Sequence, residues 1–346
     1  MEERRRDFLR ICSVAMATTA SSPVRAWATR IRVLGDGGNQ EGVVGTGQPS
    51  RDFQRFVGGV RLGRATRHGS LTVLWLHTAE AAPALEVATL DEARAQGTLV
   101  ITERAQASVP ELIVENRGKV HALLLAGEIL VGGKQNRVLK EDVLLPPASG
   151  ARNLGVYCVE QGRWNAGLKD FESKSTLAAP SLRQQLMQKA DQAQVWAEVS
   201  KSARAAQAPS STGSYQEIYE KPEVKEHLRD VERGISATPP ASALGAAVFA
   251  GASMAGLDLF QHGSLFGREW PKLLRAYAVE AYRQGPQPVE ESKLGERVKD
   301  VLDGAARAEG MLRGNAGVGQ LFEFAVGNRQ GAALLFEGRV VHSAIL

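Results

Sequence analysis

The segment Val120-His121-Ala122-Leu123-Leu124-Leu125-Ala126-Gly127 begins a dense run of short apolar stretches, each bounded by glycine or polar residues. Short apolar runs with such boundaries are typical of buried β-strands. Three more follow at Glu128–Val131, Asp142–Leu145 and Leu154–Val159. The centre of the chain is therefore predicted to consist of strands.

The region before this run shows the same strand pattern. Strands are expected from about Phe56, and they include Ser70–Leu76, Leu85–Ala88 and Leu99–Thr102. Thr89–Gly97 is predicted to be a short helix that ends at its glycine.

The region after it changes character, because apolar residues recur at helical spacing. Ala243–Leu259 instead predicts paired buried strands, and the Glu337-Gly338 turn predicts a hairpin between Ala332–Phe336 and Arg339–Ile345. The expected helices cover Leu182–Ala206, Pro222–Arg233, Lys272–Arg283 and Leu294–Ala308. Strands and helices segregate, which favours an α+β fold: a mixed or antiparallel sheet core of many short strands, with a helical section in the C-terminal half.

The composition is that of a globular protein. The 346 residues are 43% hydrophobic and 23% charged, with a formal net charge of +4. The chain has no long block of like charges, so the sequence gives no indication of nucleic-acid binding. No uninterrupted apolar stretch reaches the roughly 20 residues of a membrane-spanning helix, so no stable membrane span is expected.

The first residues have the pattern of a twin-arginine export signal. Arg5-Arg6-Asp7-Phe8-Leu9-Arg10 precedes a weakly apolar stretch, and Ala26-Trp27-Ala28 fits a signal-peptidase site. We expect the twin-arginine translocase as a transient partner, cleavage after Ala28, and a periplasmic or extracellular mature protein. The alternative is an amphipathic N-terminal helix that happens to contain the arginine pair.

This interpretation divides the chain into three parts. Residues 1–28 would be the signal peptide, residues 29–52 a flexible glycine-rich lead-in, and residues 53–346 a single α+β domain. Cys12 would be removed with the signal, and Cys158 would then be the only mature cysteine. An intramolecular disulfide would be impossible in the mature protein.

Two polar segments thirty residues apart are the strongest candidates for a site. The first runs from Gly127-Glu128 to Gly132-Gly133-Lys134-Gln135-Asn136-Arg137. Two glycines allow a sharp turn in which amides converge on an anion, and Lys134 and Arg137 supply positive charge. The pattern suits a phosphate or carboxylate ligand, or else a tight turn with solvated basic side chains.

The second segment is Cys158-Val159-Glu160-Gln161-Gly162-Arg163-Trp164. Glu160 is a candidate general base or orienting acid, with Glu128 as a second carboxylate. Arg163 and Trp164 are candidates to clamp a ligand. The alternative is a buried Glu160–Arg163 pair that fixes the strand ends. Cys158 is interpreted as a small buried residue and not as a nucleophile.

Sequence motifs for metal binding, nucleophilic catalysis and nucleotide binding are largely absent. The six histidines show no metal-ligand spacing, and neither a nucleophile elbow nor a complete P-loop is present. The sequence therefore indicates no metal and no identifiable cofactor.

At the two polar segments the chain resembles the ARG and rhodanese-phosphatase-superfamily-associated protein domain family, in which ARG denotes ADP-ribosylglycohydrolase. The resemblance rests on Gly-Glu-x-x-x-Gly-Gly-Lys-Gln-Asn-Arg at 127–137 and Cys-Val-Glu-x-Gly-Arg-Trp at 158–164, with a looser match from Asp258 to Ala278. It extends from about Phe53 to Leu346. It implies an ADP-ribose-like or nucleotide ligand, but it carries over no catalytic residue.

Two functions stay open at this point. The chain either binds or hydrolyses a phosphate-bearing ligand at Gly132, Gly133, Lys134, Gln135, Asn136, Arg137, Arg163 and Trp164, with Glu160 and Glu128 as candidate catalytic acids. Or it is a non-enzymatic interaction or scaffold domain of the cell envelope, in which the same residues form a buried structural network.

Overall fold

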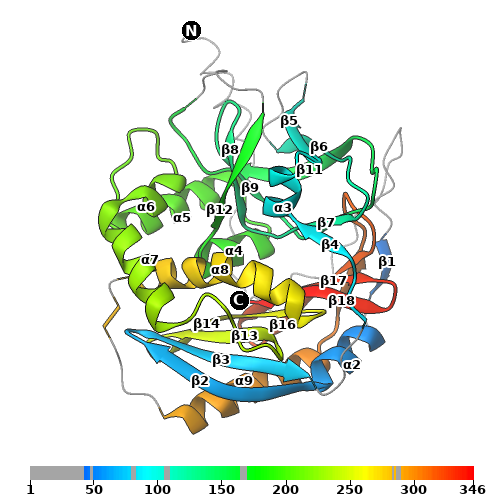
Figure 1. The fold of residues 1–346 in the computed structure, drawn as a ribbon, viewed down its shortest axis with the longest axis vertical. Coiled ribbons are helices and arrows are strands. Elements are labelled where there is room, and N and C mark those ends of the chain that lie inside the picture. The colour runs from blue at the N-terminus through cyan, green and yellow to red at the C-terminus, as the bar shows by residue number, and fades with distance from the viewer. Residues whose placement is uncertain are drawn as a thin grey trace, which may run out of the picture. The chain divides into compact units, whose positions relative to one another are not determined.

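A nine-stranded antiparallel sheet forms the lower half of the computed structural model as drawn in Figure 1. The structure describes the backbone of residues 43–46, and residues 50–78, 83–104, 110–163, 170–282, 284–285 and 290–346. In spatial order, the strands of this sheet are β1 (Val43–Thr46), β15 (Gly310–Arg313), β16 (Gln320–Val326), β17 (Arg329–Phe336), β18 (Arg339–Ile345), β14 (Ser253–Phe260), β13 (Ala243–Ala250), β3 (Leu71–Thr78) and β2 (Val60–His68).

Two smaller sheets lie above it. The six-stranded sheet has the order β12 (Phe171–Leu177), β8 (Glu128–Gly132), β9 (Arg137–Leu139), β11 (Arg152–Cys158), β6 (Glu111–Asn116) and β5 (Leu99–Glu103). The three-stranded sheet has the order β10 (Val143–Leu145), β7 (His121–Leu124) and β4 (Val87–Thr89), and its β4–β7 pair is parallel.

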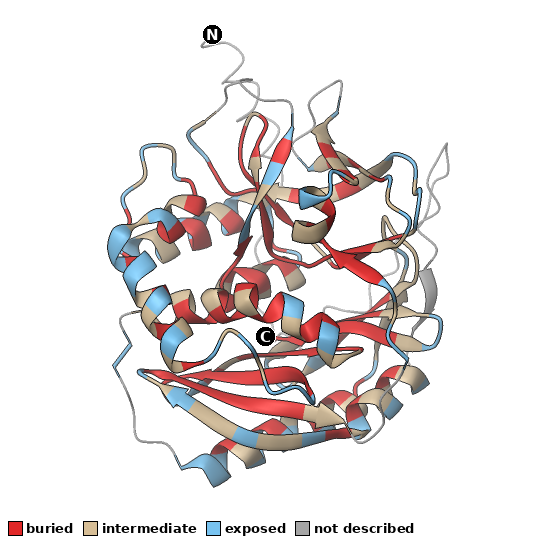
Figure 2. Cartoon of the chain, in the orientation of Figure 1, coloured by how far each residue is buried: buried red, intermediate tan, exposed pale blue. Residues whose placement is uncertain are grey.

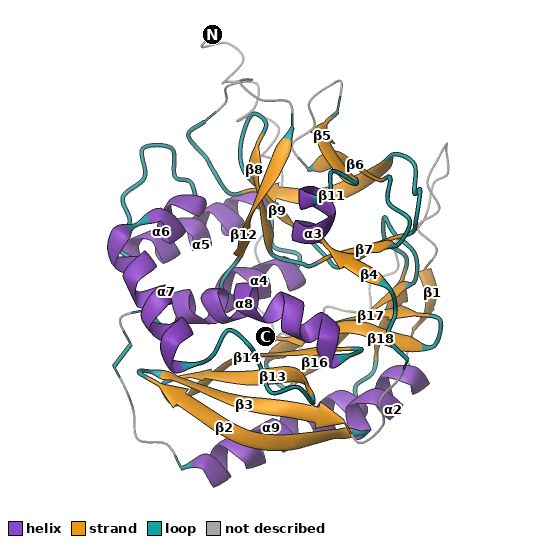
Figure 3. Cartoon of the chain, in the orientation of Figure 1, coloured by secondary structure: helices purple, strands orange, loops and turns teal. Residues whose placement is uncertain are grey.

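The helices lie mainly between and beside the sheets (Figure 3). They are α2 (Arg51–Gly58), α3 (Leu90–Ala95), α4 (Pro180–Met187), α5 (Gln192–Ala205), α6 (Gln216–Glu220), α7 (Pro222–Gly234), α8 (Gly263–Glu280) and α9 (Glu291–Ala306). This combination of largely antiparallel sheets with a run of helices from α4 to α9 confirms the predicted α+β fold class.

The large sheet is buried on both faces, as Figure 2 shows for its central strands. Because side chains alternate along a strand, Ala246 and Val248 of β13 pack in the core that includes α8, whereas Ala247 and Phe249 pack in the core that includes α2 and α9. Helix α8 therefore lies between the large sheet and β12 of the smaller one.

Several predicted boundaries differ from the structure. The residues near Phe56 form α2 instead of a strand, because Ser50 caps the helix and Phe53 and Val57 share its buried face. The expected helix over Leu182–Ala206 is two helices, and the second restarts at a capping box between Asp191 and Gln194.

Helix α8 starts at Gly263, well before the expected Lys272, and contains Pro271. Buried Phe266 and Trp270 hold this first half against the core, so tertiary packing outweighs the cost of the proline. The C-terminal hairpin forms as predicted, since Glu337 and Gly338 both have positive φ, as a type I′ turn requires.

Residues from Glu41 to Leu346 form one compact unit. The expected signal peptide and cleavage site lie outside the described residues, so those boundaries stay predictions. In the described part of the chain, every helix is too short or too polar to cross a membrane.

Candidate functional site

The loop between β8 and β9 carries the first polar segment, and its backbone is already held by the protein. The amide of Lys134 donates to Glu103 Oε1 at 2.7 Å, and that of Asn136 donates to Glu160 Oε2 at 3.0 Å. Gly132 donates to Asn136 Oδ1 at 3.1 Å. These amides therefore shape the loop and do not point together at an empty anion cradle.

The two glycines are required by close packing. A Cβ on Gly132, whose φ is +143°, would lie 2.3 Å from the Asp170 carbonyl oxygen. A Cβ on Gly133 would lie 2.4 Å from the Phe171 ring. Both residues thus allow the loop to approach the chain just before and within β12.

The second polar segment folds directly onto this loop. Arg163 donates through Nη1 to the Gly133 carbonyl at 2.8 Å, and through Nη2 to the Gly132 carbonyl at 3.1 Å and to Asn136 Oδ1 at 3.0 Å. Its Nε donates to Glu160 Oε2 at 2.9 Å. The structure therefore brings the two segments together, with Arg163 as a clamp on the loop.

Glu160 accepts three hydrogen bonds from within the chain. Besides Arg163 and the Asn136 amide, the Thr212 hydroxyl donates to its Oε1 at 2.8 Å. Burial alone would raise the pKa of Glu160, but these three donors outweigh it and hold the pKa below its usual value. The side chain is thus an ionised anchor for Arg163, and its lowered pKa makes it a weak base.

Arg137 is buried beneath the loop, with only 1% of its side chain exposed. Its Nη1 donates to the carbonyl and side-chain oxygens of Gln135 at 3.1 and 3.3 Å. Its Nη2 lies 3.9 Å from Glu103 Oε1, and its Nε has no hydrogen-bond partner. This guanidinium therefore has weak charge compensation.

Cys158 lies beside it and acts as a neutral thiol. Its Sγ donates to Gln135 Oε1 at 3.1 Å, and burial raises the pKa of the thiol to about 11. Gln135 Nε2 donates to the Glu160 carbonyl at 2.7 Å, and Asn136 Nδ2 to Ser214 Oγ at 3.0 Å. Both amide side chains are therefore engaged within the protein.

Glu128 belongs to a different cluster. Arg137 on β9 lies opposite Leu130 of β8 and Cys158 of β11, and these two strands run in the same direction. Glu128 comes two residues before Leu130, whereas Glu160 comes two residues after Cys158, so the two glutamates lie on opposite sides of Arg137 along the strands. About four residues of strand, or about 13 Å, separate their levels. The structure does not place the two carboxylates where both could act on the same bond of a ligand.

Lys272 of α8 is the partner of Glu128, and the pair is buried. The same ammonium group lies 2.9 Å from Glu269 and 3.1 Å from Asp91. Burial is the largest cause that raises the pKa of Glu128, to about 8, and the attraction of Lys272 opposes it.

A second buried cluster surrounds His342. Its Nδ1 lies 2.6 Å from Asp142 Oδ2 and its Nε2 lies 3.1 Å from Asp258 Oδ1. Asp258 also accepts hydrogen bonds from Arg183, at 2.6 and 3.2 Å, and from Tyr277 at 2.5 Å. Two carboxylate partners favour the doubly protonated ring.

Sequence reasoning did not single out these buried groups. Asp258 and His342 stand in apolar strands, and Glu269 and Lys272 stand on the buried face of a helix. A charged residue at a core position of an apolar run is the signal that could have identified them. Trp164 lies outside the described residues.

The comparisons with known proteins place the chain in one family. A family model described as "ARG and Rhodanese-Phosphatase-superfamily-associated Protein domain" matches residues 59–346, as the two polar segments suggested. Neither the curated proteins nor the solved structures gave a match.

Proposed function

The chain belongs to the ARG and Rhodanese-Phosphatase-superfamily-associated Protein domain family, and we propose that it binds a phosphate-bearing small molecule at Arg137. The observation that carries the proposal is the weakly compensated guanidinium. A buried charge without a close partner is costly, and an anionic ligand would supply the missing partner.

Arg183 makes the contrast clear. Both arginines are 1% exposed, and the Nε of each has no hydrogen-bond partner. Arg183 nevertheless has two hydrogen bonds to the Asp258 carboxylate, whereas the nearest carboxylate oxygen to Arg137 is 3.9 Å away. A planar guanidinium suits phosphate, which it can bind through two parallel hydrogen bonds. The family's name refers to ADP-ribosylglycohydrolases and to a phosphatase superfamily, and this supports a phosphate ligand such as ADP-ribose or a nucleotide.

Glu103 gives the ligand a route to Arg137. Its carboxylate, 13% exposed at the end of β5, is the nearest anion to the guanidinium. A phosphate group would displace this side chain and take its place beside Nη2. Lys134, partly exposed on the same loop, adds positive charge, and Glu160 keeps Arg163 and the loop in position.

A titration calorimetry series on the full chain tests the proposal. Pyrophosphate, AMP and ADP-ribose should bind, whereas adenosine and ribose should not. Arg137→Met should weaken binding about 10- to 100-fold, which is the effect of losing a charge-assisted hydrogen bond. Arg183→Met is the matched buried control, and the molecules of this variant that fold should bind with unchanged affinity. The proposal fails if no phosphate compound binds or if Arg137→Met binds equally well.

A structural scaffold is the second candidate function. The observation that favours it is the Glu160–Arg163 pair, in which every donor group of Arg163 is used within the chain. In that case the loop is a fixed surface of an interaction domain, and no phosphate compound would stabilise the protein.

We also propose export by the twin-arginine route, on the pattern of Arg5, Arg6 and Ala26–Ala28. A buried free thiol at Cys158 is compatible with an exported protein that needs no disulfide. Cell fractionation of the Arg5→Lys, Arg6→Lys double variant tests this. Export independent of both arginines would contradict it.

A further inference from the structure

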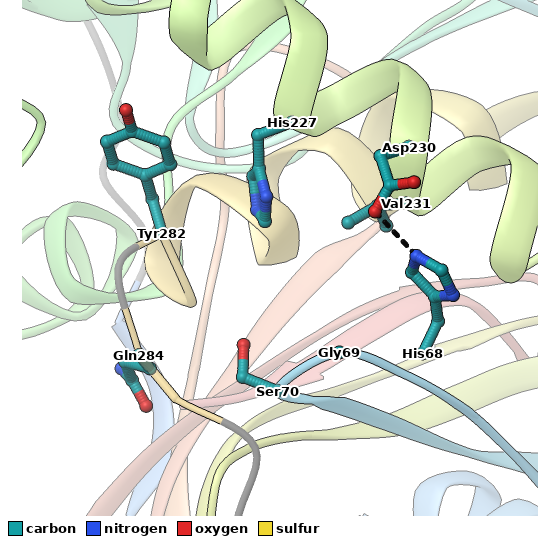
Figure 4. A pocket seen from close by; sticks show the side chains of 8 residues that line it. All are labelled: His68, Gly69, Ser70, His227, Asp230, Val231, Tyr282 and Gln284. Atoms are coloured by element: carbon teal, nitrogen blue, oxygen red, sulfur yellow. Dashed lines mark hydrogen bonds and ion pairs between the residues drawn. The ribbon is translucent and has the colours of Figure 1, made fainter.

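A cavity of about 640 Å³ lies away from the loop described above (Figure 4). It is formed by the turn between β2 and β3, one face of α7, and the C-terminal end of α8. Its volume is in the range of small-molecule sites. Its lining residues are His68, Gly69, Ser70, His227, Asp230, Val231, Tyr282 and Gln284.

Three of these side chains donate a hydrogen bond to a carbonyl near the end of α8. His227 Nε2 lies 3.1 Å from the Ala278 oxygen, Ser70 Oγ donates to the Ala281 oxygen at 3.3 Å, and Gln284 Nε2 donates to the Glu280 oxygen at 3.2 Å. A carbonyl can only accept, so the bound nitrogen of His227 must carry a proton.

This arrangement leaves mainly acceptor atoms for a ligand. They are Nδ1 of His227 in the tautomer that carries its proton on Nε2, the Ser70 hydroxyl lone pairs and Gln284 Oε1. Figure 4 shows His227 and Ser70 pointing toward one another across the space. A ligand that fills it must therefore be rich in hydrogen-bond donors.

The cavity carries negative charge, which suits a hydrogen-bond donor that is also a cation. Asp230 contributes a carboxylate that is about half exposed, and the 18-residue helix α8 ends here with the negative end of its dipole. His68 and the exposed Arg233 lie 2.7 and 3.3 Å from the Asp230 carboxylate, so a ligand cation would share this counter-charge with them. His227 and Tyr282 pack edge to face at 5.3 Å, which adds aromatic surface for a cation.

Two other interpretations do not fit. In the parts of the chain that the structure describes, histidine, cysteine and acidic side chains form no group of three or more that suits a metal ion. A serine nucleophile would have to give its proton to a histidine base, but the Ser70 hydroxyl donates its proton to the Ala281 carbonyl.

We propose that this cavity binds a small organic ammonium ion. The ammonium group would donate to Ser70 Oγ, His227 Nδ1 and Gln284 Oε1, with Asp230 as its counter-charge. The site is separate from the proposed phosphate site, and either can fail without the other.

Titration of the full chain with putrescine, and with 1,4-butanediol as its uncharged isostere, tests this proposal. Putrescine should bind and butanediol should not. Asp230→Asn should weaken putrescine binding about fivefold, as expected for an exposed charge pair. Asp300→Asn, an exposed aspartate on α9, is the matched control and should change nothing.

Ser70→Ala keeps the Asp230–His68 contact intact and guards against a misfolded Asp230 variant. It should also weaken putrescine binding several-fold. The proposal is overturned if putrescine does not bind, if butanediol binds equally well, or if the Ser70 and Asp230 variants both retain full affinity.

Discussion

Arg183 Nη2 lies 2.6 Å from Asp258 Oδ1, and both side chains are 1% exposed. This pair anchors α4 to β14 in the interior, and Tyr277 and His342 complete the shell of Asp258. The other arginine buried to the same degree, Arg137, has its nearest carboxylate, that of Glu103, 3.9 Å away. The two positions therefore respond differently to the same substitution.

Arg183→Met should lower the free energy of unfolding by about 3–5 kcal/mol, because it leaves Asp258 buried with its main counter-charge removed. Arg137→Met should change it by less than about 1 kcal/mol in the absence of ligand, because the lost charge was weakly compensated. Urea denaturation measures both. Equal losses would mean that Arg137 is a structural residue.

Glu103→Gln should increase the affinity for pyrophosphate. Glu103 is the nearest anion to Arg137 and competes with a phosphate group for the same guanidinium, so removing its charge favours the ligand. An increase of about three- to tenfold is expected, and calorimetry measures it. Glu115→Gln, on the neighbouring strand β6, serves as control. Weaker binding by the Glu103 variant would place the anion elsewhere.

The fold was easier to predict than the ionic clusters, and the reason is physical. Strand and helix patterns are local, so the β17–β18 hairpin and α7 could be located from neighbouring residues. The partners in the clusters are remote: Lys272 and Glu128 are 144 residues apart, and His342 and Asp142 are 200 apart. No local pattern encodes such a contact.

The two polar segments were predicted as candidates for a site, and the structure brings them together because β9 and β11 are neighbours. The hydrogen-bond partners of the Arg163 guanidinium could not be predicted from the sequence. Its partners are the backbone carbonyls of Gly132 and Gly133, and these depend on the positive φ angles of the loop. The second half of α8 was predicted from Lys272 onward, but the half before it was not, because the burial of Phe266 and Trp270 is a tertiary effect.

The stability of the chain should fall as the pH rises from about 5 to 8, and Glu128 is one cause. Burial raises its pKa to about 8 in the folded chain, whereas an unfolded glutamate has a pKa of 4.5. The folded state therefore holds a proton that the unfolded state has released, so stability decreases with pH in this window. Glu128→Gln should flatten the dependence between pH 5 and 6.5. An unchanged slope in urea titrations would contradict the assignment.

His342 should make the stability of the chain depend on pH in a higher range. Burial opposes the charge of the ring, but Asp142 and Asp258 outweigh it and raise the pKa to about 9 from a usual 6.5. Its stabilising contribution is complete below about pH 6.5 and is lost as the pH rises through 9. Between pH 8 and 9 the slope should therefore depend mainly on His342, because Glu128 loses the rest of its proton across this range. A His342→Gln variant with an unaltered slope in this range would refute the role.

Glu160→Gln separates the two candidate functions. The substitution removes the charge that holds Arg163, so the clamp on Gly132 and Gly133 weakens and the Asn136 amide loses an ionised acceptor. If the segments are only a structural scaffold, the loss should approach about 3 kcal/mol and the protein should unfold readily. If they hold a ligand loop, we expect a folded variant with faster amide hydrogen exchange over residues 132–137 and weaker pyrophosphate binding. Asp300→Asn is the control for a carboxylate lost from the surface. A folded Glu160→Gln variant with native exchange rates and native affinity would show that Glu160 does not position the loop.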